Sequence, residues 1–270
     1  MDAARLALLV VSAVAGMAVL MAAAWLVQQR HQTSRWVDSS WTFSVGLVGA
    51  IVALVPFDAD PLRQVLLAVV ALFWSVRLGG HLMKRNAKIA DDPRYAHLAR
   101  QWGAAAAQRM FFFLQSQALV GAVLAIAVGL AAHHPGRFGR VQDIVGAGLA
   151  LIAVGGEALA DYQLALHRRS GNGAICERGL WSWSRHPNYF FEWLGWLAIA
   201  IIAADGDGSY VFGSLAFAAP AVMYWTLVYV SGIPPLEMHL QKTRGSTFAH
   251  YQSRVSRFFP WPPKRGRDAS

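Results

Sequence analysis

The sequence predicts an all-α polytopic membrane protein, and three observations support this fold class. Of the 270 residues, 56% are hydrophobic and only 14% are charged, which is too apolar for an ordinary soluble domain. Seven apolar segments alternate with polar connections, and several approach the roughly 20 residues that cross a bilayer core. Basic residues gather in alternate connections, as expected of loops that face anionic lipid. We therefore expect about seven transmembrane helices.

The seven predicted spans are 6–28, 41–56, 62–83, 110–133, 143–166, 188–204 and 209–233. The first span is longer than the apolar part of a signal peptide and shows no clear cleavage site, so we expect a membrane helix there. The second and sixth spans are short for a bilayer core. We expect residues 1–260 to form a single membrane-embedded domain, followed by a mobile basic tail at 261–270.

The distribution of Lys and Arg predicts the orientation. With seven spans, the connections at 29–40, 84–109 and 167–187 share one side with the C-terminal tail, and that side carries 19 of the 24 basic residues. The other side carries Arg5, Arg63, Arg137 and Arg140. The positive-inside rule therefore places the C-terminus in the cytoplasm and the N-terminus outside. We expect an integral protein of the bacterial inner membrane.

The net charge of +9 bears on the partners. Because the basic residues separate apolar runs, membrane lipids are the expected partners and nucleic acid is not. Cys176 is the only cysteine, so no intrachain disulfide is possible. The sequence predicts no metal site and leaves the oligomeric state open.

The stretch from 179 to 192 concentrates candidate chemistry where polar sequence gives way to an apolar run. Its polar members are Arg185, His186, Asn188, Tyr189 and Glu192. Pro187 suits the first turn of a helix, which puts Asn188 and Glu192 on one face. A carboxylate one turn into a membrane helix is costly to bury, so we expect Glu192 to face a partner or a cavity. The alternative is an interfacial anchor at the level of the lipid headgroups.

Further polar residues fall inside or beside the predicted spans. Two more pairs share a helix face four residues apart, Arg77 with His81 and Glu157 with Asp161. A structural alternative is that Arg77 simply pairs with one of these two carboxylates. Burying such groups without compensation costs at least ~2.5 kcal/mol for each Arg or Asp at a helix centre. This cost indicates that the spans surround a functional site.

The connection at 167–187 is rich in arginine. Arg168, Arg169, Arg178 and Arg185 lie within it. Guanidinium groups bind phosphate through paired hydrogen bonds, so this loop is expected to bind lipid headgroups or a phosphorylated cofactor. It contains neither a G-x-G-x-x-G fingerprint nor a P-loop, so a Rossmann-type site is not supported.

Two other segments carry candidates near the cytoplasmic side. Asp92-Pro93 favours a turn that places Tyr95 near the cytoplasmic mouth, as a proton donor or as a headgroup anchor. Prolines at 234 and 235 force a break or a new helix start. The basic, aromatic segment that follows is typical of an interfacial helix, with Glu237 and Tyr251 as its site candidates.

These residues carry a resemblance. Asp161-Tyr162, Gly179-Leu-Trp181, and Ser184 to Tyr189 followed by Glu192 resemble the steroid 5-alpha-reductase-like superfamily, and more narrowly its bacterial DUF1295 (domain of unknown function 1295) branch, over about residues 36–262. The resemblance implies a seven-helix membrane fold. It also implies NADPH-dependent reduction of a carbon–carbon double bond conjugated to a carbonyl, in a lipophilic, lipid or steroid-like substrate.

The resemblance also implies a cofactor site that faces the cytoplasm. Positions that match family cofactor ligands are Asp161, Arg168, Asn188 and Glu192. Arg185, His186 and Tyr189 belong to the same block, and we add Arg178, Glu237 and Tyr251 as cofactor-binding candidates. NADPH is the expected cofactor.

The sequence departs from the steroid reductases at the pair that polarises the carbonyl. Those enzymes carry a Glu in the second span and a Tyr in the third, whereas 41–56 contains no carboxylate and Trp74 stands near the expected Tyr. Asp38, just before the second span, is the candidate to replace the Glu. His81 or Tyr95 is the candidate to replace the Tyr as the other donor. Two alternatives remain. One is a membrane methyltransferase of the isoprenylcysteine type, which uses S-adenosylmethionine and shares the Arg-His-Pro-x-Tyr block, and the other is a non-catalytic lipid-binding protein.

Overall fold

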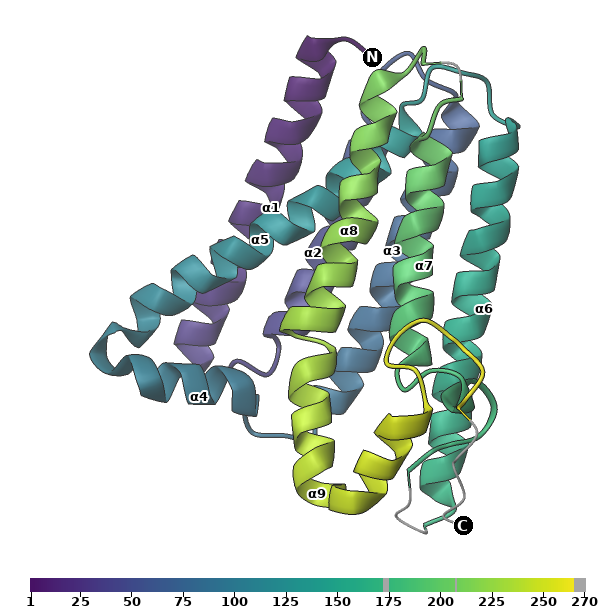
Figure 1. Ribbon diagram of the computed structural model, residues 1–270. Coiled ribbons are helices and arrows are strands. Elements are labelled where there is room, and N and C mark those ends of the chain that lie inside the picture. The colour runs from purple at the N-terminus through teal and green to yellow at the C-terminus, as the bar shows by residue number, and fades with distance from the viewer. Residues whose placement is uncertain (172–174, 207, 265–270) are drawn as a thin grey trace. The chain divides into compact units, whose positions relative to one another are not determined.

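The computed structural model describes residues 1–264 except 172–174 and 207. Every regular element in this part of the chain is helical, which confirms the all-α class (Figure 1). The chain forms two compact units. Unit 1 comprises Met1–Asp143 and Ile202–Ala219, and unit 2 comprises Ile144–Ile201 and Pro220–Ser270. The single domain expected over 1–260 stays a prediction, and residues 265–270 of the expected mobile tail lie outside the described residues.

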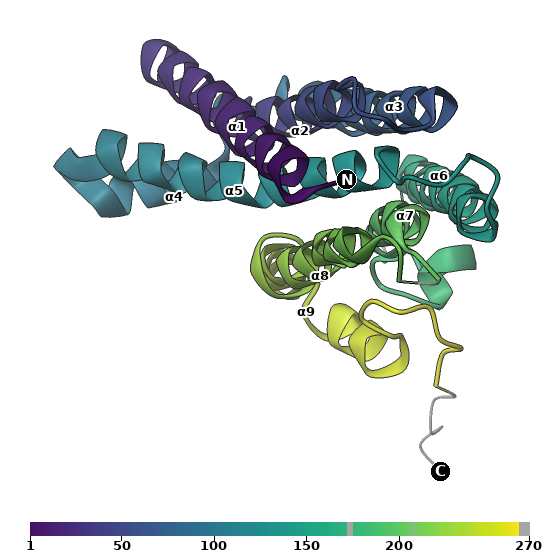
Figure 2. The ribbon, with the colours of Figure 1, turned by 90° about the horizontal axis from the view of Figure 1, so that it is seen from above.

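The described part of unit 1 contains five complete α-helices and two 3₁₀ segments. They are α1 (Ala3–His31), α2 (Val37–Ala53), α3 (Pro61–Asn86), α4 (Pro93–Trp102), η1 (Gly103–Ala105), α5 (Ala106–Ala132) and η3 (Val211–Phe217). In Figure 2, α2 and α3 lie side by side, and α1 crosses the neighbouring α5. Aspartates start three of the helices, because Asp2, Asp60 and Asp92 accept hydrogen bonds from backbone N–H groups of the first turn. Pro61 and Pro93 occupy the first positions of α3 and α4, where a missing N–H costs nothing.

The contact between α2 and α3 depends on small residues. A Cβ atom at Gly46 would overlap the Ser75 side chain. A Cβ atom at Gly79 would lie 2.8 Å from the Phe43 ring. Glycines therefore let the two backbones approach closely, which is how membrane helices commonly pack.

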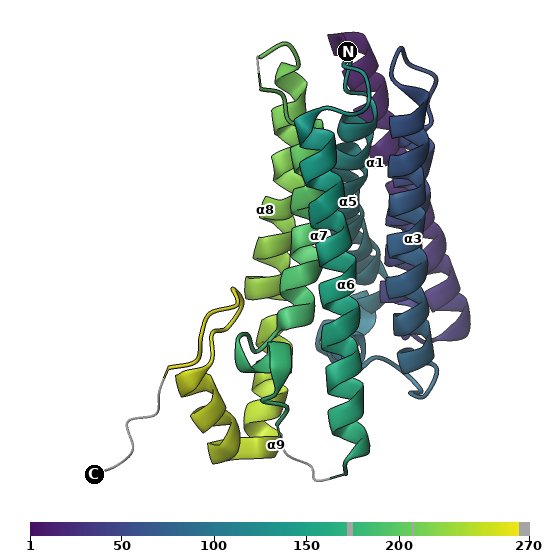
Figure 3. The same cartoon turned by 90° about the vertical axis from the view of Figure 1, so that its right-hand side faces the viewer.

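Unit 2 contains most of α6 (Val141–Arg169), then η2 (Gly179–Ser182), α7 (Pro187–Ala203), α8 (Ala218–Trp225) and α9 (Ile233–Arg254). Helices α6, α7 and α8 run alongside one another (Figure 3). A π-helical turn at Thr226–Val230 separates α8 from α9. Helix α9 begins at the two prolines, as predicted, and turns back on itself at Gly245, whose φ of 50° is non-helical (Figure 1).

The predicted spans all fall on helices, and five of the described helical stretches are long and apolar enough to cross a membrane. They are Ala3–His31, Pro61–Asn86, Pro93–Ala132, Val141–Arg169 and Val211–Arg254. The chain thus has the character of a membrane protein, while the count of seven spans and their orientation stay predictions. The second predicted span was placed too late, because α2 begins at Val37 and includes Asp38 in its first turn. The charged and polar residues from 38 to 40 hid this extra turn.

Candidate functional site

Two of the predicted catalytic residues meet in unit 1. The Tyr95 hydroxyl, on α4, donates a hydrogen bond of 2.7 Å to Oδ1 of Asp38, on α2. The other oxygen of Asp38 accepts from Nη2 of Arg94. Tyr95 is buried, whereas the side chains of Asp38 and Arg94 are 23% and 40% exposed. The result is a carboxylate and a phenol in direct contact, with the carboxylate partly open to its surroundings.

The local sequence explains how Tyr95 reaches this position. Asp92 caps α4 and also holds the Arg94 guanidinium through bonds of 2.8 and 3.0 Å. The preceding Asp91 accepts from the backbone N–H of Ser34 at 2.6 Å, which ties the start of α4 to the link between α1 and α2. The segment 91–95 therefore fixes α4 against α2, and Asp38 has a structural role beside any chemical one.

His81, the alternative donor, does not join this cluster. It lies on α3 with an exposed side chain. In the described part of the chain it makes no hydrogen bond to Asp38 or Tyr95. The geometry thus favours Tyr95 over His81 as the partner of Asp38.

Four predicted cofactor residues of unit 2 bind one another or the backbone. Nε of Arg185 donates to Oε1 of Glu237 at 2.7 Å, and Nε2 of His186 lies 3.0 Å from the same oxygen. The Tyr251 hydroxyl donates to the backbone oxygen of Trp181 at 2.6 Å. Burial lowers the pKa of His186, while its hydrogen bond to Glu237 opposes the shift. This group joins the 181–186 stretch to α9.

The same stretch also holds the segment that follows α9. Nη1 of Arg185 donates to the backbone oxygens of Gln252 and Val255, at 3.2 and 2.7 Å. The Ser184 hydroxyl donates to the backbone oxygen of Phe258 at 2.8 Å, and Ser184 forms a parallel β-bridge with Ser256. Much of the hydrogen-bonding capacity of the Arg-His block is therefore used in fixing the chain beyond 250.

The remaining block residues face other partners. Nδ2 of Asn188, in the first turn of α7, lies 3.4 Å from Oδ1 of Asp161 on α6. The Tyr189 ring stacks on His186, with 5.6 Å between ring centroids. Glu192, one turn into α7, is buried. Of the predicted cofactor residues, the structure brings Asp161 and Asn188 together.

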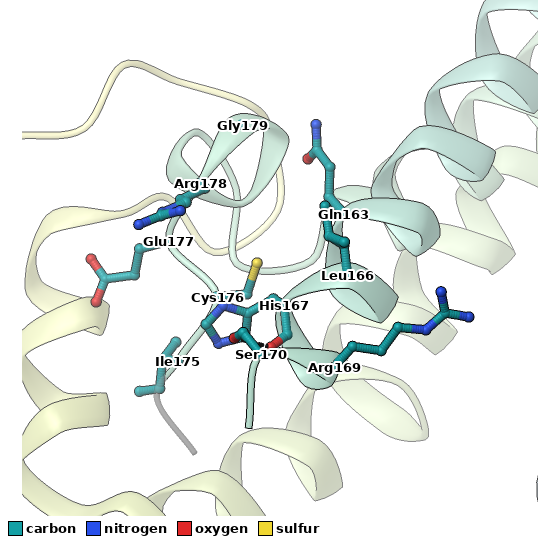
Figure 4. A pocket seen from close by; sticks show the side chains of 10 residues that line it. All are labelled: Gln163, Leu166, His167, Arg169, Ser170, Ile175, Cys176, Glu177, Arg178 and Gly179. Atoms are coloured by element: carbon teal, nitrogen blue, oxygen red, sulfur yellow. Dashed lines mark hydrogen bonds between the residues drawn. The ribbon is translucent and has the colours of Figure 1, made fainter. Parts of the chain in front are cut away.

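A cavity of about 760 Å³ lies within unit 2, between the C-terminal end of α6 and the segment 175–179. Its lining residues are Gln163, Leu166, His167, Arg169, Ser170, Ile175, Cys176, Glu177, Arg178 and Gly179. Figure 4 shows His167 on the helix and Cys176 on the segment, with the Arg178 and Arg169 side chains extending to opposite sides. Of the predicted cofactor residues, Arg178 lines this cavity.

Positive charge dominates the cavity wall. Arg169 and Arg178 carry guanidinium groups, and the single carboxylate, Glu177, is paired with Nη2 of Arg254 at 2.5 Å. Such a lining suits an anionic ligand, because guanidinium groups bind phosphate with paired, charge-assisted hydrogen bonds. Burial raises the pKa of the Cys176 thiol, so this side chain is a neutral part of the wall at neutral pH.

Sequence reasoning missed a buried ion pair in unit 1. Arg63 is fully buried and all five N–H donors of its guanidinium are bonded. Two go to Asp143, at 3.2 and 2.9 Å, and three go to the backbone oxygens of His134, Gly136 and Arg137. The sequence places Arg63 only among the basic residues of the outer side, because its partner Asp143 lies 80 positions away.

A second arginine completes this cluster. Nη2 of Arg140 lies 2.8 Å from Oδ1 of Asp143, and Nη1 lies 2.7 Å from Nε2 of His134. Burial and the cations Arg140 and Arg63 lower the pKa of His134 to about 4, against weaker opposing effects of Asp205 and Asp143. The i, i+3 spacing of Arg140 and Asp143 was the signal available in the sequence.

Comparison with known proteins gives one match. The model of the DUF1295 family, described as a protein of unknown function, matches residues 24–255. No curated protein and no solved structure matches the chain significantly.

Proposed function

The chain belongs to the DUF1295 family, and from that premise we propose that it is an NADPH-dependent membrane reductase. Its proposed substrate is a lipid or steroid-like molecule with a carbon–carbon double bond conjugated to a carbonyl. The observation that carries the proposal is the hydrogen bond between Asp38 and Tyr95. The resemblance to steroid 5-alpha-reductases calls for a carboxylate and a phenol that polarise the carbonyl. Asp38 and Tyr95 are such a pair, although they stand at other positions than the Glu and Tyr of those enzymes.

In this proposal Tyr95 donates a hydrogen bond to the carbonyl oxygen of the substrate. Asp38 holds the phenol and, with Arg94, provides a charged partner for it. A preorganised donor aimed at a developing oxyanion contributes strongly to catalysis because it needs no reorganisation during the reaction. NADPH would supply, when bound, the hydride that goes to the β carbon of the double bond, and a proton from solvent would complete the reduction at the α carbon.

The residues of unit 2 suit the chemistry of that cofactor. The cavity wall includes Arg169 and Arg178, and a volume of about 760 Å³ is of the size that ligand pockets have. Arg185, His186 and Glu237 carry less weight as direct ligands, because they bond to one another. We assign to them the fixing of the 181–186 stretch beside α9.

Cofactor binding is tested with the full-length protein in detergent. NADPH should raise the melting temperature, and S-adenosylmethionine should not. Arg178→Gln should weaken NADPH binding about tenfold, because a charge-assisted hydrogen bond to phosphate is lost. Arg244→Gln, an exposed arginine of α9, is the matched control. A shift with S-adenosylmethionine alone would replace the reductase by a methyltransferase.

Catalysis is tested by consumption of NADPH with a panel of lipophilic enones. Tyr95→Phe should lower kcat by about 10²-fold or more while leaving NADPH binding intact, since it removes only the hydroxyl. His81→Phe should change little, because His81 lies apart from the pair. Full activity of Tyr95→Phe would remove Tyr95 from the mechanism.

A further inference from the structure

Gln117, on α5, is the second residue that binds the Tyr95 hydroxyl. Its Nε2 donates to the phenolic oxygen at 3.1 Å. Its backbone oxygen accepts from the indole N–H of Trp41, on α2, at 2.9 Å. Helices α2, α4 and α5 therefore meet around one phenol, and Gln117 is held in place by α2.

The hydrogen-bonding capacity of the phenol is limited. A tyrosine hydroxyl has one proton to donate and lone pairs to accept with. In the structure the proton goes to Asp38, and one lone pair is taken by the Gln117 amide. A carbonyl ligand can only accept a hydrogen bond, so the phenolic O–H must rotate from Asp38 toward the carbonyl oxygen. During this rotation the amide of Gln117 and the helix packing keep the phenolic oxygen in place.

We propose that Gln117 is a positioning residue that acts through Tyr95. Its amide fixes the phenolic oxygen and directs the proton away from α5, toward Asp38 or a bound carbonyl. Donation to the oxygen also favours negative charge there, which strengthens the phenol as a hydrogen-bond donor. This inference rests on the proposed reductase function, and it assigns to Gln117 a role that the sequence did not suggest.

Two substitutions separate orientation from packing. Gln117→Glu keeps the shape of the side chain but replaces the amide donor by a carboxylate acceptor. Gln117→Leu removes the donor and the acceptor of the side chain. We expect each to lower kcat about tenfold with little change in KM for the enone, and Glu to be at least as harmful as Leu. If Gln117 only filled space, Gln117→Glu would be the milder change. Kinetics within twofold of wild type for Gln117→Glu would overturn the proposal.

Gln115 offers a matched control on the same helix. Its amide donates to the backbone oxygen of Ala18 at 3.3 Å and makes no contact with the phenol. Gln115→Leu should leave kcat unchanged. A loss equal to that of Gln117→Leu would show a general effect on α5 and would also overturn the proposal.

A measurement without turnover separates this inference from the proposed function. The protein is labelled with [¹³Cζ]tyrosine, and the signal of Tyr95 is assigned as the one that Tyr95→Phe removes. Gln117→Leu should shift that signal and Gln115→Leu should not, because the ¹³Cζ shift follows hydrogen bonding at the phenolic oxygen. An unchanged signal in Gln117→Leu refutes the positioning role, even if the wild-type protein reduces enones. A shifted signal in a protein that reduces no enone refutes the proposed function instead.

Discussion

Two of the arginine–aspartate pairs in unit 1 have opposite properties. In the Arg63–Asp143 pair both side chains are almost completely buried, at 0% and 1% exposure. In the Arg94–Asp38 pair the side chains are 40% and 23% exposed. All five donors of Arg63 are bonded, whereas Nη1 of Arg94 has no hydrogen-bond partner among the described residues.

The contrast separates a structural pair from a candidate site. A guanidinium whose donors are all used within the fold has nothing left to offer a ligand, so Arg63 serves to hold α3, the first turn of α6 and the 134–137 loop together. Nη1 of Arg94 stays without a partner among the described residues, and Asp38 accepts a hydrogen bond from the phenol that the proposed mechanism uses. Charge and residue type are the same in both pairs. The pairs differ in how many of the arginine's N–H donors are already hydrogen-bonded within the fold.

The largest expected effect comes from breaking the saturated pair. Arg63→Met leaves Asp143 buried with only part of its compensation and should cost about 3–5 kcal/mol of stability. Thermal melting and size-exclusion chromatography of the detergent-purified protein measure this loss. Arg137→Met, at an exposed arginine nearby, should change stability by less than about 0.5 kcal/mol. Equal melting temperatures for the two variants would contradict the structural role of Arg63.

The next effect is expected at the half-buried Glu237. Glu237→Ala removes the partner of both Arg185 and His186 and should cost about 2 kcal/mol. It should also make the chain beyond 250 more sensitive to protease. Glu177→Ala removes a more exposed carboxylate, 32% accessible, and should cost less than about 1 kcal/mol. The reverse order of the two losses would argue against the role given to Glu237.

A smaller effect is expected from pH. Because the pKa of His134 is about 4 in the folded protein and near 6.5 when unfolded, the unfolded chain binds more protons between these values. Stability is therefore full above pH 6.5 and falls as the pH drops toward 4, by about 1 kcal/mol between pH 7 and 5.5. Melting temperatures across this range measure the slope. His134→Gln should flatten it without abolishing it, since burial also lowers the pKa of His186.

The smallest stability effect belongs to the open pair. Arg94→Gln should cost less than about 1 kcal/mol, because exposed ion pairs contribute little. In the proposed reductase the same change should lower kcat by about tenfold, since Asp38 loses its cationic partner. Arg100→Gln, also exposed on α4, should affect neither quantity. A large loss of stability in Arg94→Gln would mean that the two pairs differ less than their exposure indicates.

Local sequence signals predicted much of the fold. The apolar runs located the helices, and Pro187 and the prolines at 234 and 235 located the starts of α7 and α9. Short-range patterns succeed here because membrane helices need long apolar stretches and prolines are tolerated at a helix start. The short helix α4 was expected only as a turn, although Asp92 and Pro93 are good signals for a helix start.

The candidate site was predicted as a set of residues, without its contacts. Asp38 and Tyr95 were both chosen, yet nothing in the sequence linked two residues 57 positions apart. Gln117 was missed because an amide in an apolar helix has no motif around it. The ion pair of Arg63 was missed because its partner, Asp143, lies on another helix. Such pairings arise from the packing of helices, which a single sequence does not encode as a visible pattern.

The hydrogen bonds of Arg185 also have a consequence for biosynthesis. Two of its backbone partners, in Gln252 and Val255, are made 67 and 70 residues later than the arginine itself. At about 5–20 residues per second, the ribosome needs about 4–14 s to add that stretch. Until residues 252–258 are made, Arg185 and Ser184 lack the backbone oxygens that they bind in this segment. The local structure around Arg185 is therefore completed only when the segment 252–258 has been translated.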